Sequence, residues 1–257
     1  MPERQLAIIT GASSGIGREI AMLAAAEGYD LVLAADEPLV DAAAGLGRDG
    51  IEVEAVETDL STPAGVERLL AAAAGRDVDV LVANAGHGLG HGFLDQDVAA
   101  WRHVIDTNIT GTLLLLQPVL KQMAARGQGK VLITGSIAGH LAGSFQAVYN
   151  GSKAFIDSFA AAIGNELKDS GVTITCLKPG PTDTRFFARA DMLDTKVGQA
   201  AKDDPSDVAA TGWKAMKDGE HSVVHGLKNK AQVLASGVLS EAATAEMHRK
   251  QAEPGSG

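Results

Sequence analysis

Several kinds of residue are scarce in this 257-residue sequence, and each scarcity argues against a class of protein. The single cysteine, Cys176, excludes an internal disulfide and suits a small buried apolar residue. Lys and Arg total 22 against 32 Asp and Glu, and the net charge of -10 argues against a nucleic-acid partner. No apolar run approaches the roughly 18 residues of a membrane span, so we expect no membrane partner. The first residues also lack an apolar signal region, and we expect a cytoplasmic protein.

The remaining composition is typical of a folded domain, with 46% hydrophobic and 21% charged residues. Short apolar runs alternate with segments of helical periodicity, and no linker divides the chain. This alternation predicts one α/β domain over residues 1–257, with a doubly wound parallel sheet of about seven strands and helices on both faces. Strands are predicted at 6–10, 31–35, 53–56, 78–83, 130–134, 172–177 and 222–225. The main helices are predicted at 15–27, 38–46, 62–74, 97–125, 148–167 and 205–217, with a further helical stretch at 230–249.

Two segments do not follow this alternation. Residues 179–204 have weak periodicity, and a segment of this length suggests a lid over a substrate site, which we place at about 186–204. The tail at 253–257 contains Gly, Ser and Pro, and we expect it to be mobile.

A glycine-rich turn follows the first predicted strand and precedes a predicted helix. Glycines allow a tight turn and a close backbone approach, and the following helix offers unpaired N–H groups and a positive dipole end to a pyrophosphate. The alternative is that these glycines only turn the chain. The sequence therefore predicts a dinucleotide site formed by Gly11, Ser13, Ser14, Gly15, Ile16 and Gly17.

Tyr149 and Lys153 lie four residues apart in the predicted helix 148–167. This spacing places the phenol and the ammonium on one helical face, where the positive charge would lower the pKa of the tyrosine below its ordinary value of roughly 10. A tyrosine of this kind can donate or accept a proton in carbonyl or alcohol chemistry. The alternative is an ordinary amphipathic helix face.

The Gly-x-x-x-Gly-x-Gly spacing at 11–17, combined with Tyr-x-x-x-Lys at 149–153, resembles the short-chain dehydrogenase/reductase family. The resemblance extends in the correct order from residue 5 to about residue 187, and it implies a single-domain Rossmann fold and an NAD(P)-dependent oxidoreductase. It also implies cofactor contacts for Tyr149 and Lys153 and for four further segments. These are Asp59 and Leu60; Asn84, Ala85 and Gly86; Pro179 and Gly180; and Thr182 and Thr184.

The resemblance assigns roles to four catalytic residues. Tyr149 would be the acid/base, and Lys153 would lower its pKa and bind the nicotinamide ribose. Ser136, thirteen residues before Tyr149, would donate a hydrogen bond to the substrate oxygen. The backbone carbonyl of Asn108 would hold a water molecule on the proton path.

Asp36 follows the second predicted strand, about twenty residues beyond the glycine turn, where a side chain can reach the adenosine ribose. Its carboxylate would accept hydrogen bonds from ribose hydroxyls and repel a 2′-phosphate. We therefore expect NAD as the cofactor, with NADP disfavoured. Two alternatives remain, namely that Asp36 only places charge at a helix start or that Arg18 turns toward this site.

The substrate is expected to be a medium-sized, partly apolar ketone, aldehyde or secondary alcohol. Substrate contacts are predicted for Ser136, His140, Phe145, Gln146, Tyr149 and Phe186. His87 and His91 are four apart in a glycine-rich stretch that does not preorganise metal ligands, so no metal site is predicted.

Two other functions share these motifs. One is a 3-oxoacyl-thioester reductase, which the acidic composition disfavours because acidic carrier partners dock on basic surfaces. The other is a non-catalytic NAD-binding sensor, which would not need Ser136, Tyr149 and Lys153. The family resemblance also implies a homodimer or homotetramer joined through the long predicted helices.

Overall fold

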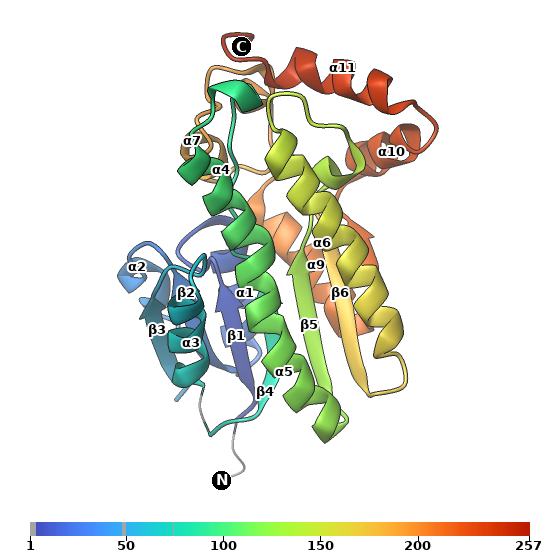
Figure 1. Cartoon of the computed structure of the whole chain (residues 1–257). Helices are drawn as coiled ribbons and strands as arrows, with labels where there is room; N and C mark the ends of the chain where they lie inside the picture. Colours follow the sequence, from blue (N-terminus) through green and yellow to red (C-terminus); the bar gives the residue numbers. More distant parts are fainter. Residues whose placement is uncertain (1–3, 48–49, 74) are drawn as a thin grey trace.

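A single parallel sheet forms the centre of the computed structural model, which describes residues 4–47, 50–73 and 75–257. Its seven strands lie in the order β3-β2-β1-β4-β5-β6-β7, and every neighbouring pair is parallel (Figure 1). The strands are β1 (Leu6–Thr10), β2 (Asp30–Ala35), β3 (Val53–Glu57), β4 (Val78–Ala83), β5 (Gly129–Thr134), β6 (Val172–Lys178) and β7 (Ser222–Val224). The predicted doubly wound parallel sheet is confirmed, and each predicted strand end agrees to within one residue.

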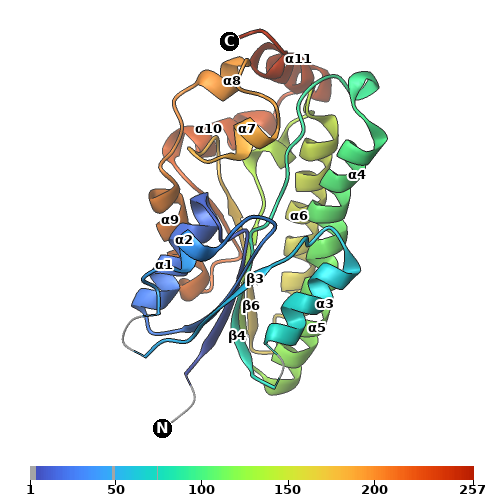
Figure 2. The ribbon, with the colours of Figure 1, turned by 90° about the vertical axis from the view of Figure 1, so that its left-hand side faces the viewer.

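Helices cover both faces of this sheet (Figure 2). One face carries α1 (Gly15–Ala26), α2 (Val40–Ala43) and α9 (Pro205–Asp218), and the other carries α3 (Pro63–Ala72), α5 (Thr112–Arg126) and α6 (Ala147–Glu166). Alternate side chains of β1 enter the two cores, because Leu6 and Ile8 point to one layer and Ala7 and Ile9 to the other. Burial on both faces explains why the strands are continuous apolar runs in the sequence.

The helix predicted at 97–125 is not one regular α-helix. Instead, α4 (Val98–Ile105) continues through a π-helical turn, η2 (Asp106–Gly111), into α5. Gly111 ends this turn against the loop after β3, where a Cβ atom would lie 1.9 Å from the Leu60 carbonyl oxygen. This contact joins residues far apart in the sequence, so helical periodicity could not predict it. The prediction of one regular helix at 97–125 is wrong.

The predicted helical stretch at 230–249 is also divided in the structure. It consists of α10 (Leu227–Ser236) and α11 (Glu241–Ala252). Gly237 follows the end of α10, and Ser240 caps the start of α11 by accepting a hydrogen bond from the Ala243 N–H at 3.2 Å. The two helices cross over the sheet end that carries the strand C-termini (Figure 1).

Helix ends agree less closely with the predictions than strand ends. The helix predicted at 38–46 is shorter in the structure, where only α2 (Val40–Ala43) is helical. Gly45, just beyond it, has a left-handed φ of 80°. Residue 74, the predicted end of the helix at 62–74, lies outside the described residues. In the part of the chain that the structure describes, no helix is long and apolar enough to cross a membrane.

Residues 181–203 form a loop whose two ends are tied together. The Asp183 N–H donates to the Asp203 carbonyl at 2.9 Å, and the Asp203 N–H donates to the Pro181 carbonyl at 2.9 Å. The loop contains two short helices, α7 (Phe186–Arg189) and α8 (Lys196–Gln199). We call residues 186–204, the segment predicted to cover the substrate site, the lid.

The lid packs against the C-terminal end of the chain. Phe187 and Ala252 are buried in a small apolar cluster separate from the two sheet cores. The tail at 253–257, expected to be mobile, hydrogen-bonds to the lid. The Gly255 N–H donates to the Asp194 carboxylate at 2.7 Å, and the Gly257 N–H donates to the Asp194 carbonyl at 2.9 Å.

The contact at Gly111 leads to a stability prediction. Gly111→Ala should lower the free energy of unfolding by about 2 kcal/mol or more, because its methyl group would collide with the Leu60 backbone. Gly151→Ala is the matched control, since Gly151 lies in α6 with no atom within 4 Å of an added Cβ; it should raise stability by up to about 1 kcal/mol. Urea unfolding measures both, and equal effects would contradict the packing argument.

Candidate active site

A pocket of about 750 Å³ opens at the carboxyl ends of the strands, where β1 and β4 are neighbours. The chain leaves β1 toward β2 on one side and leaves β4 toward β5 on the other, and a crevice forms where these connections diverge. Of the residues expected at the cofactor, Gly17 lies buried in α1 behind the glycine turn. The others line this pocket: Gly11, Ser13, Ser14, Gly15, Ile16, Asp36, Asp59, Leu60, Asn84, Ala85, Gly86, Tyr149, Lys153, Pro179, Gly180, Thr182 and Thr184.

The glycine turn has the geometry of a phosphate cradle. Gly11 and Gly15 have φ angles of 65° and 55°, in the left-handed region that favours glycine. A Cβ atom on Gly17 would lie 2.3 Å from the Gly11 carbonyl oxygen, so the helix can approach the strand only without a side chain there. Because α1 begins at Gly15, its unpaired N–H groups lie at the pocket wall. These residues fit a dinucleotide.

Asn84 connects the ends of three neighbouring strands beneath the pocket. The Thr10 hydroxyl accepts hydrogen bonds from the Asn84 and Ala85 N–H groups, both at 2.9 Å. The Asn84 amide donates to the Thr10 carbonyl at 3.0 Å and accepts from the Thr134 hydroxyl at 3.0 Å. The structure therefore ties the ends of β1, β4 and β5 together at this residue.

Ser136, Tyr149 and Lys153 meet on one wall of the pocket. Ser136 follows β5 and caps the 3-10 turn η3 (Ile137–His140), whereas Tyr149 and Lys153 lie one turn apart on α6. All three side chains belong to buried residues. The Lys153 ammonium donates to the Thr134 carbonyl at 2.8 Å and lies 5.9 Å from the centre of the Tyr149 ring.

Burial is the largest influence on the pKa values of Tyr149 and Lys153. Removal from water raises the pKa of Tyr149 to about 12, although a hydrogen bond with Ser136 lowers it; the Asp157 carboxylate raises it further. Burial also lowers the pKa of Lys153, against the attraction of Asp157. In this structure the pKa of Tyr149 is therefore raised, opposite to the direction predicted from Lys153, because burial is the largest influence and the Lys153 ammonium is directed at the Thr134 carbonyl.

Asn108 lies in the π-helical turn and is buried behind the pocket. Its side-chain oxygen accepts from the His87 N–H at 2.7 Å, and its amide donates to the His87 carbonyl at 3.0 Å and to the Ser152 hydroxyl at 2.9 Å. These three bonds connect the loop after β4 to α6. Asn108 therefore fixes the distance between the pocket floor and the helix that carries Tyr149.

The residues expected at the substrate divide into two groups. Gln146 and Phe186 line the pocket with Ser136 and Tyr149, and the Phe186 ring lies 5.0 Å from the Tyr149 ring. The other two, His140 and Phe145, lie elsewhere.

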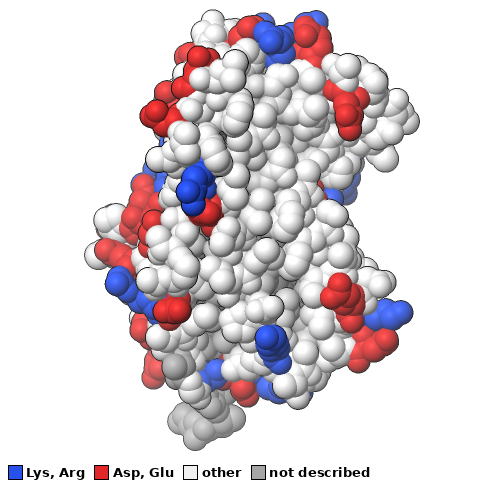
Figure 3. Space-filling model, in the orientation of Figure 1, with Lys and Arg blue, Asp and Glu red and all other residues white. Residues whose placement is uncertain are grey.

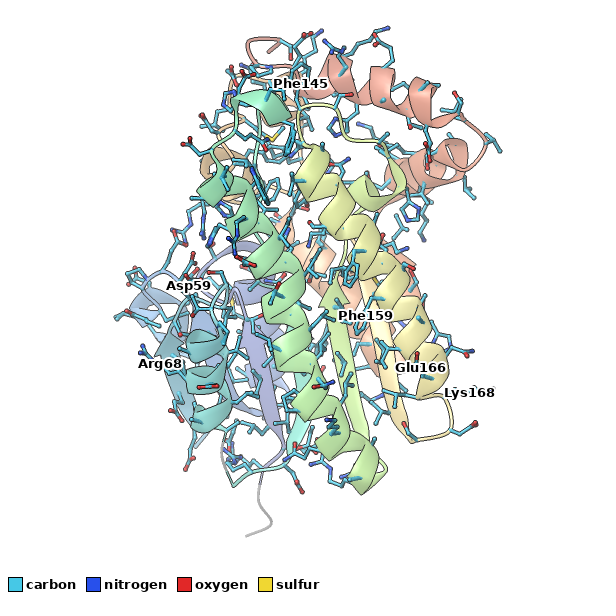
Figure 4. All side chains as sticks on the ribbon, in the orientation of Figure 1. Asp59, Arg68, Phe145, Phe159, Glu166 and Lys168 are labelled. Carbon is cyan, nitrogen blue, oxygen red and sulfur yellow. The ribbon has the colours of Figure 1, made fainter. Side chains whose placement is uncertain are left out.

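His140 faces the space between α6 and β6, with its ring nitrogen 3.1 Å from the Lys178 ammonium and 3.5 Å from Asp157. Burial and Lys178 lower the pKa of His140. Phe145 packs under the Arg249 guanidinium of α11 at 5.0 Å, near the C-terminal end of the molecule and far from Glu166 and Lys168 (Figure 4). Neither position follows from the sequence, because the partners of these residues lie on β6, α6 and α11.

Asp36 is paired with a residue that the sequence analysis did not single out. The Arg189 guanidinium of α7 holds both carboxylate oxygens of Asp36, at 3.2 and 2.5 Å. Although partial burial raises it, these hydrogen bonds hold the pKa of Asp36 below its ordinary range. The sequence offered one hint, the four-residue spacing of Arg185 and Arg189, which would place them on one helical face. It does not show which acidic residues they pair with.

The C-terminal helices form a wall of the pocket, which the sequence analysis also missed. The lining residues from α10 and α11 are Lys228, Asn229, Gln232, Met247, His248, Lys250 and Gln251. His248 is anchored by a 2.8 Å hydrogen bond between its ring and the Ser144 carbonyl. The only available signal was amphipathic periodicity, which does not say what a helix covers.

The histidines of the glycine-rich loop have other partners. His87 packs edge-on against His103 with ring centres 4.9 Å apart, and burial followed by the His103 charge lowers the pKa of His87 to about 4. His91 pairs with Asp191 of the lid at 2.8 Å. Among the described residues, no group of three or more His, Cys, Asp or Glu could hold a metal ion.

Comparisons with known proteins give a consistent result. A family model described as short chain dehydrogenase matches residues 5–192. An uncharacterized oxidoreductase of Staphylococcus aureus strain MW2 is 32% identical over 221 residues, covering 84% of this chain and 93% of that protein. A short-chain dehydrogenase from Sphingobium yanoikuyae in complex with NADPH has a TM-score of 0.80 and 26% identity, covering 92% of this chain and 96% of its own. A short-chain dehydrogenase/reductase from Burkholderia phymatum in complex with NAD has a TM-score of 0.81 and 25% identity, covering 90% and 92%.

The raised pKa of Tyr149 predicts an alkaline loss of stability. Since its folded-state pKa of about 12 exceeds the unfolded value of roughly 10, this contribution is fully present below pH 10 and is lost as pH rises toward about 12. Between pH 8 and about 11, wild type should lose about 1 kcal/mol more than Tyr149→Phe in urea unfolding. Tyr29→Phe is the control: it removes the alkaline loss linked to Tyr29, whose pKa burial also raises, but should keep the loss linked to Tyr149. Equal losses in wild type and Tyr149→Phe would contradict the argument.

Proposed function

The chain belongs to the short-chain dehydrogenase family, and we propose that it transfers a hydride between a nicotinamide dinucleotide and a ketone, an aldehyde or a secondary alcohol. One observation carries the proposal. The proton-handling residues Ser136, Tyr149 and Lys153 line the same pocket as the phosphate cradle at Gly11 and Gly15. A dinucleotide on the cradle and a carbonyl beside the tyrosine would therefore share one enclosed space.

Tyr149 is the proposed acid/base. When bound, the nicotinamide ring supplies the hydride acceptor or donor. The Tyr149 hydroxyl would protonate the carbonyl oxygen in reduction and accept the proton in oxidation. Ser136 would donate a hydrogen bond to the same oxygen as charge develops on it. With its pKa raised to about 12 by burial, the phenol is protonated at neutral pH and is ready to donate to a carbonyl oxygen.

Lys153 and Asn108 would restore the proton after each turnover. The Lys153 ammonium already lies inside the site, 2.8 Å from the Thr134 carbonyl, where it can orient the ribose of a cofactor. The side chain of Asn108 is occupied by His87 and Ser152, so we assign the relay to its backbone carbonyl, which would hold a water molecule between Lys153 and solvent.

NAD is the proposed cofactor. Asp36 lines the pocket at the end of β2, and its lowered pKa keeps it ionised, so it would accept bonds from ribose hydroxyls and repel a 2′-phosphate. Solved relatives of similar fold bind either NADPH or NAD, so this preference depends on local residues rather than on the fold.

A partly apolar substrate of medium size fits the catalytic end of the pocket. Phe186, Leu141 and Met247 supply apolar surface, and Gln146 and Gln232 supply amide groups that can orient a polar substituent. The proposed substrate class is a medium-sized, partly apolar ketone or aldehyde, or the corresponding alcohol.

We also propose that the enzyme assembles as a homodimer or homotetramer. The face that carries α5 and α6 shows few charged side chains (Figure 3). Leu114 and Phe155 on these helices are each 40% exposed. Apolar exposure on adjacent long helices is typical of a surface between subunits.

Tyr149→Phe tests the proposed function. Turnover of a panel of ketones and alcohols, measured by NADH absorbance, should fall about a thousandfold, because the substitution removes the hydroxyl proposed to move the proton. The dissociation constant for NADH should stay within about twofold of wild type, since the phosphate cradle is unchanged. Tyr29→Phe is the matched control, because Tyr29 packs on Trp213 at 5.9 Å and should leave turnover unchanged.

Two outcomes would contradict this proposal. Substantial residual turnover by Tyr149→Phe would exclude Tyr149 as the acid/base. Wild type that binds NADH but turns over no member of the panel would instead indicate a sensor without catalysis.

A further inference from the structure

Two acidic side chains at the end of β2 and two arginines from the lid region form an ion-pair cluster, which we call the ribose clamp. It consists of Asp36, Glu37, Arg185 and Arg189. Arg189 forms a two-pronged pair with Asp36 at 3.2 and 2.5 Å, and Arg185 forms one with Glu37 at 3.2 and 2.9 Å. Arg189 also lies 3.5 Å from Glu37, so the two pairs form one network.

The ribose clamp forms part of the wall of the pocket in which the cofactor is proposed to bind. Asp36, Arg185 and Arg189 line this pocket. The chain entering the lid touches the phosphate cradle directly, because a Cβ atom on Gly15 would lie 2.6 Å from the Thr184 methyl group. At the pocket wall, Arg189 covers the Asp36 carboxylate, where the ribose of the proposed dinucleotide would meet it.

The charges of the clamp balance. Asp36 and Glu37 alone would place two negative charges beside the ribose 2′ position, and Arg185 and Arg189 bring two positive charges to the same place. The Asp36 and Arg189 side chains are 37% and 34% exposed, so an incoming ligand can reach both. A planar guanidinium is also the side chain best suited to bind a phosphate with two parallel hydrogen bonds.

We infer that Arg189 determines how strongly this chain discriminates between NAD and NADP. With NAD, the ribose hydroxyls compete with Arg189 for the Asp36 carboxylate. With NADP, Arg189 offsets the negative charge of Asp36 and donates to the 2′-phosphate. Arg189 thus reduces the preference for NAD over NADP that Asp36 creates. The inference depends on the proposed binding of a nicotinamide dinucleotide, but not on catalysis by Tyr149.

Binding measurements on Arg189→Gln test this inference without turnover. Fluorescence titration gives the dissociation constants of NADH and NADPH for the intact protein. Arg189→Gln should bind NADH more tightly and NADPH more weakly, and the NADPH-to-NADH ratio of constants should rise about tenfold or more. Arg249→Gln is the matched control, since Arg249 of α11 also forms an ion pair with a glutamate, Glu253 at 3.2 Å. Its NADPH-to-NADH ratio of dissociation constants should not change.

Asp36→Asn separates discrimination from a merely structural role of the clamp. This variant breaks the same ion pair from the other side, so a clamp that only held the lid in place would change the ratio in the same direction as Arg189→Gln. Discrimination predicts the opposite direction, with NADPH binding tighter and NADH weaker.

Several results would overturn the inference. The first is an NADPH-to-NADH ratio of dissociation constants that stays unchanged in Arg189→Gln. The second is a change of this ratio in the same direction in Arg189→Gln and Asp36→Asn. The third is a ratio that changes in Arg18→Gln but not in Arg189→Gln. Wild type that binds neither dinucleotide would overturn the proposed function as well, whereas normal binding with any of these ratio results would overturn the inference alone.

Discussion

The close backbone approach at the glycine turn is the constraint on which the rest of the site depends. Gly17 must lie against the Gly11 carbonyl for α1 to begin beside β1, and the Asn84 amide occupies the same contact from β4. This approach joins the two central strands at the point where the chain connections diverge. A side chain at either glycine would separate the helix from the strand and remove the phosphate cradle and the pocket floor together.

The sequence predicts the part of the site that local patterns determine. Strands buried on both faces are continuous apolar runs, so β1 and β4 and the motifs that follow them were located closely. The π-helical turn that ends at Gly111 was missed, because the close contact of Gly111 is with the backbone of Leu60, fifty-one residues earlier in the chain. The position of His140 was missed for a similar reason, since Asp157 and Lys178 come from two other elements.

Long-range charge pairing was the hardest feature to predict. Asp36 and Arg189 are 153 residues apart in the sequence, and the pair forms only because the lid folds back over the end of β2. The sequence placed Asp36 at the pocket and named Arg18 as the arginine that could turn toward this site, but it did not indicate Arg189. Local sequence does not predict the ion pairs of a side chain when its partner comes from an irregular segment far along the chain.

The lid connects the two ends of the pocket through a single helical turn. Phe186 begins α7 and packs on Tyr149 at 5.0 Å, while Arg189 ends α7 and holds Asp36. The phenol owes its raised pKa mainly to removal from water, and Phe186 packs directly against its ring. The same four-residue helix therefore covers Tyr149 and pairs the charge of Asp36, so one short segment shapes both ends of the pocket.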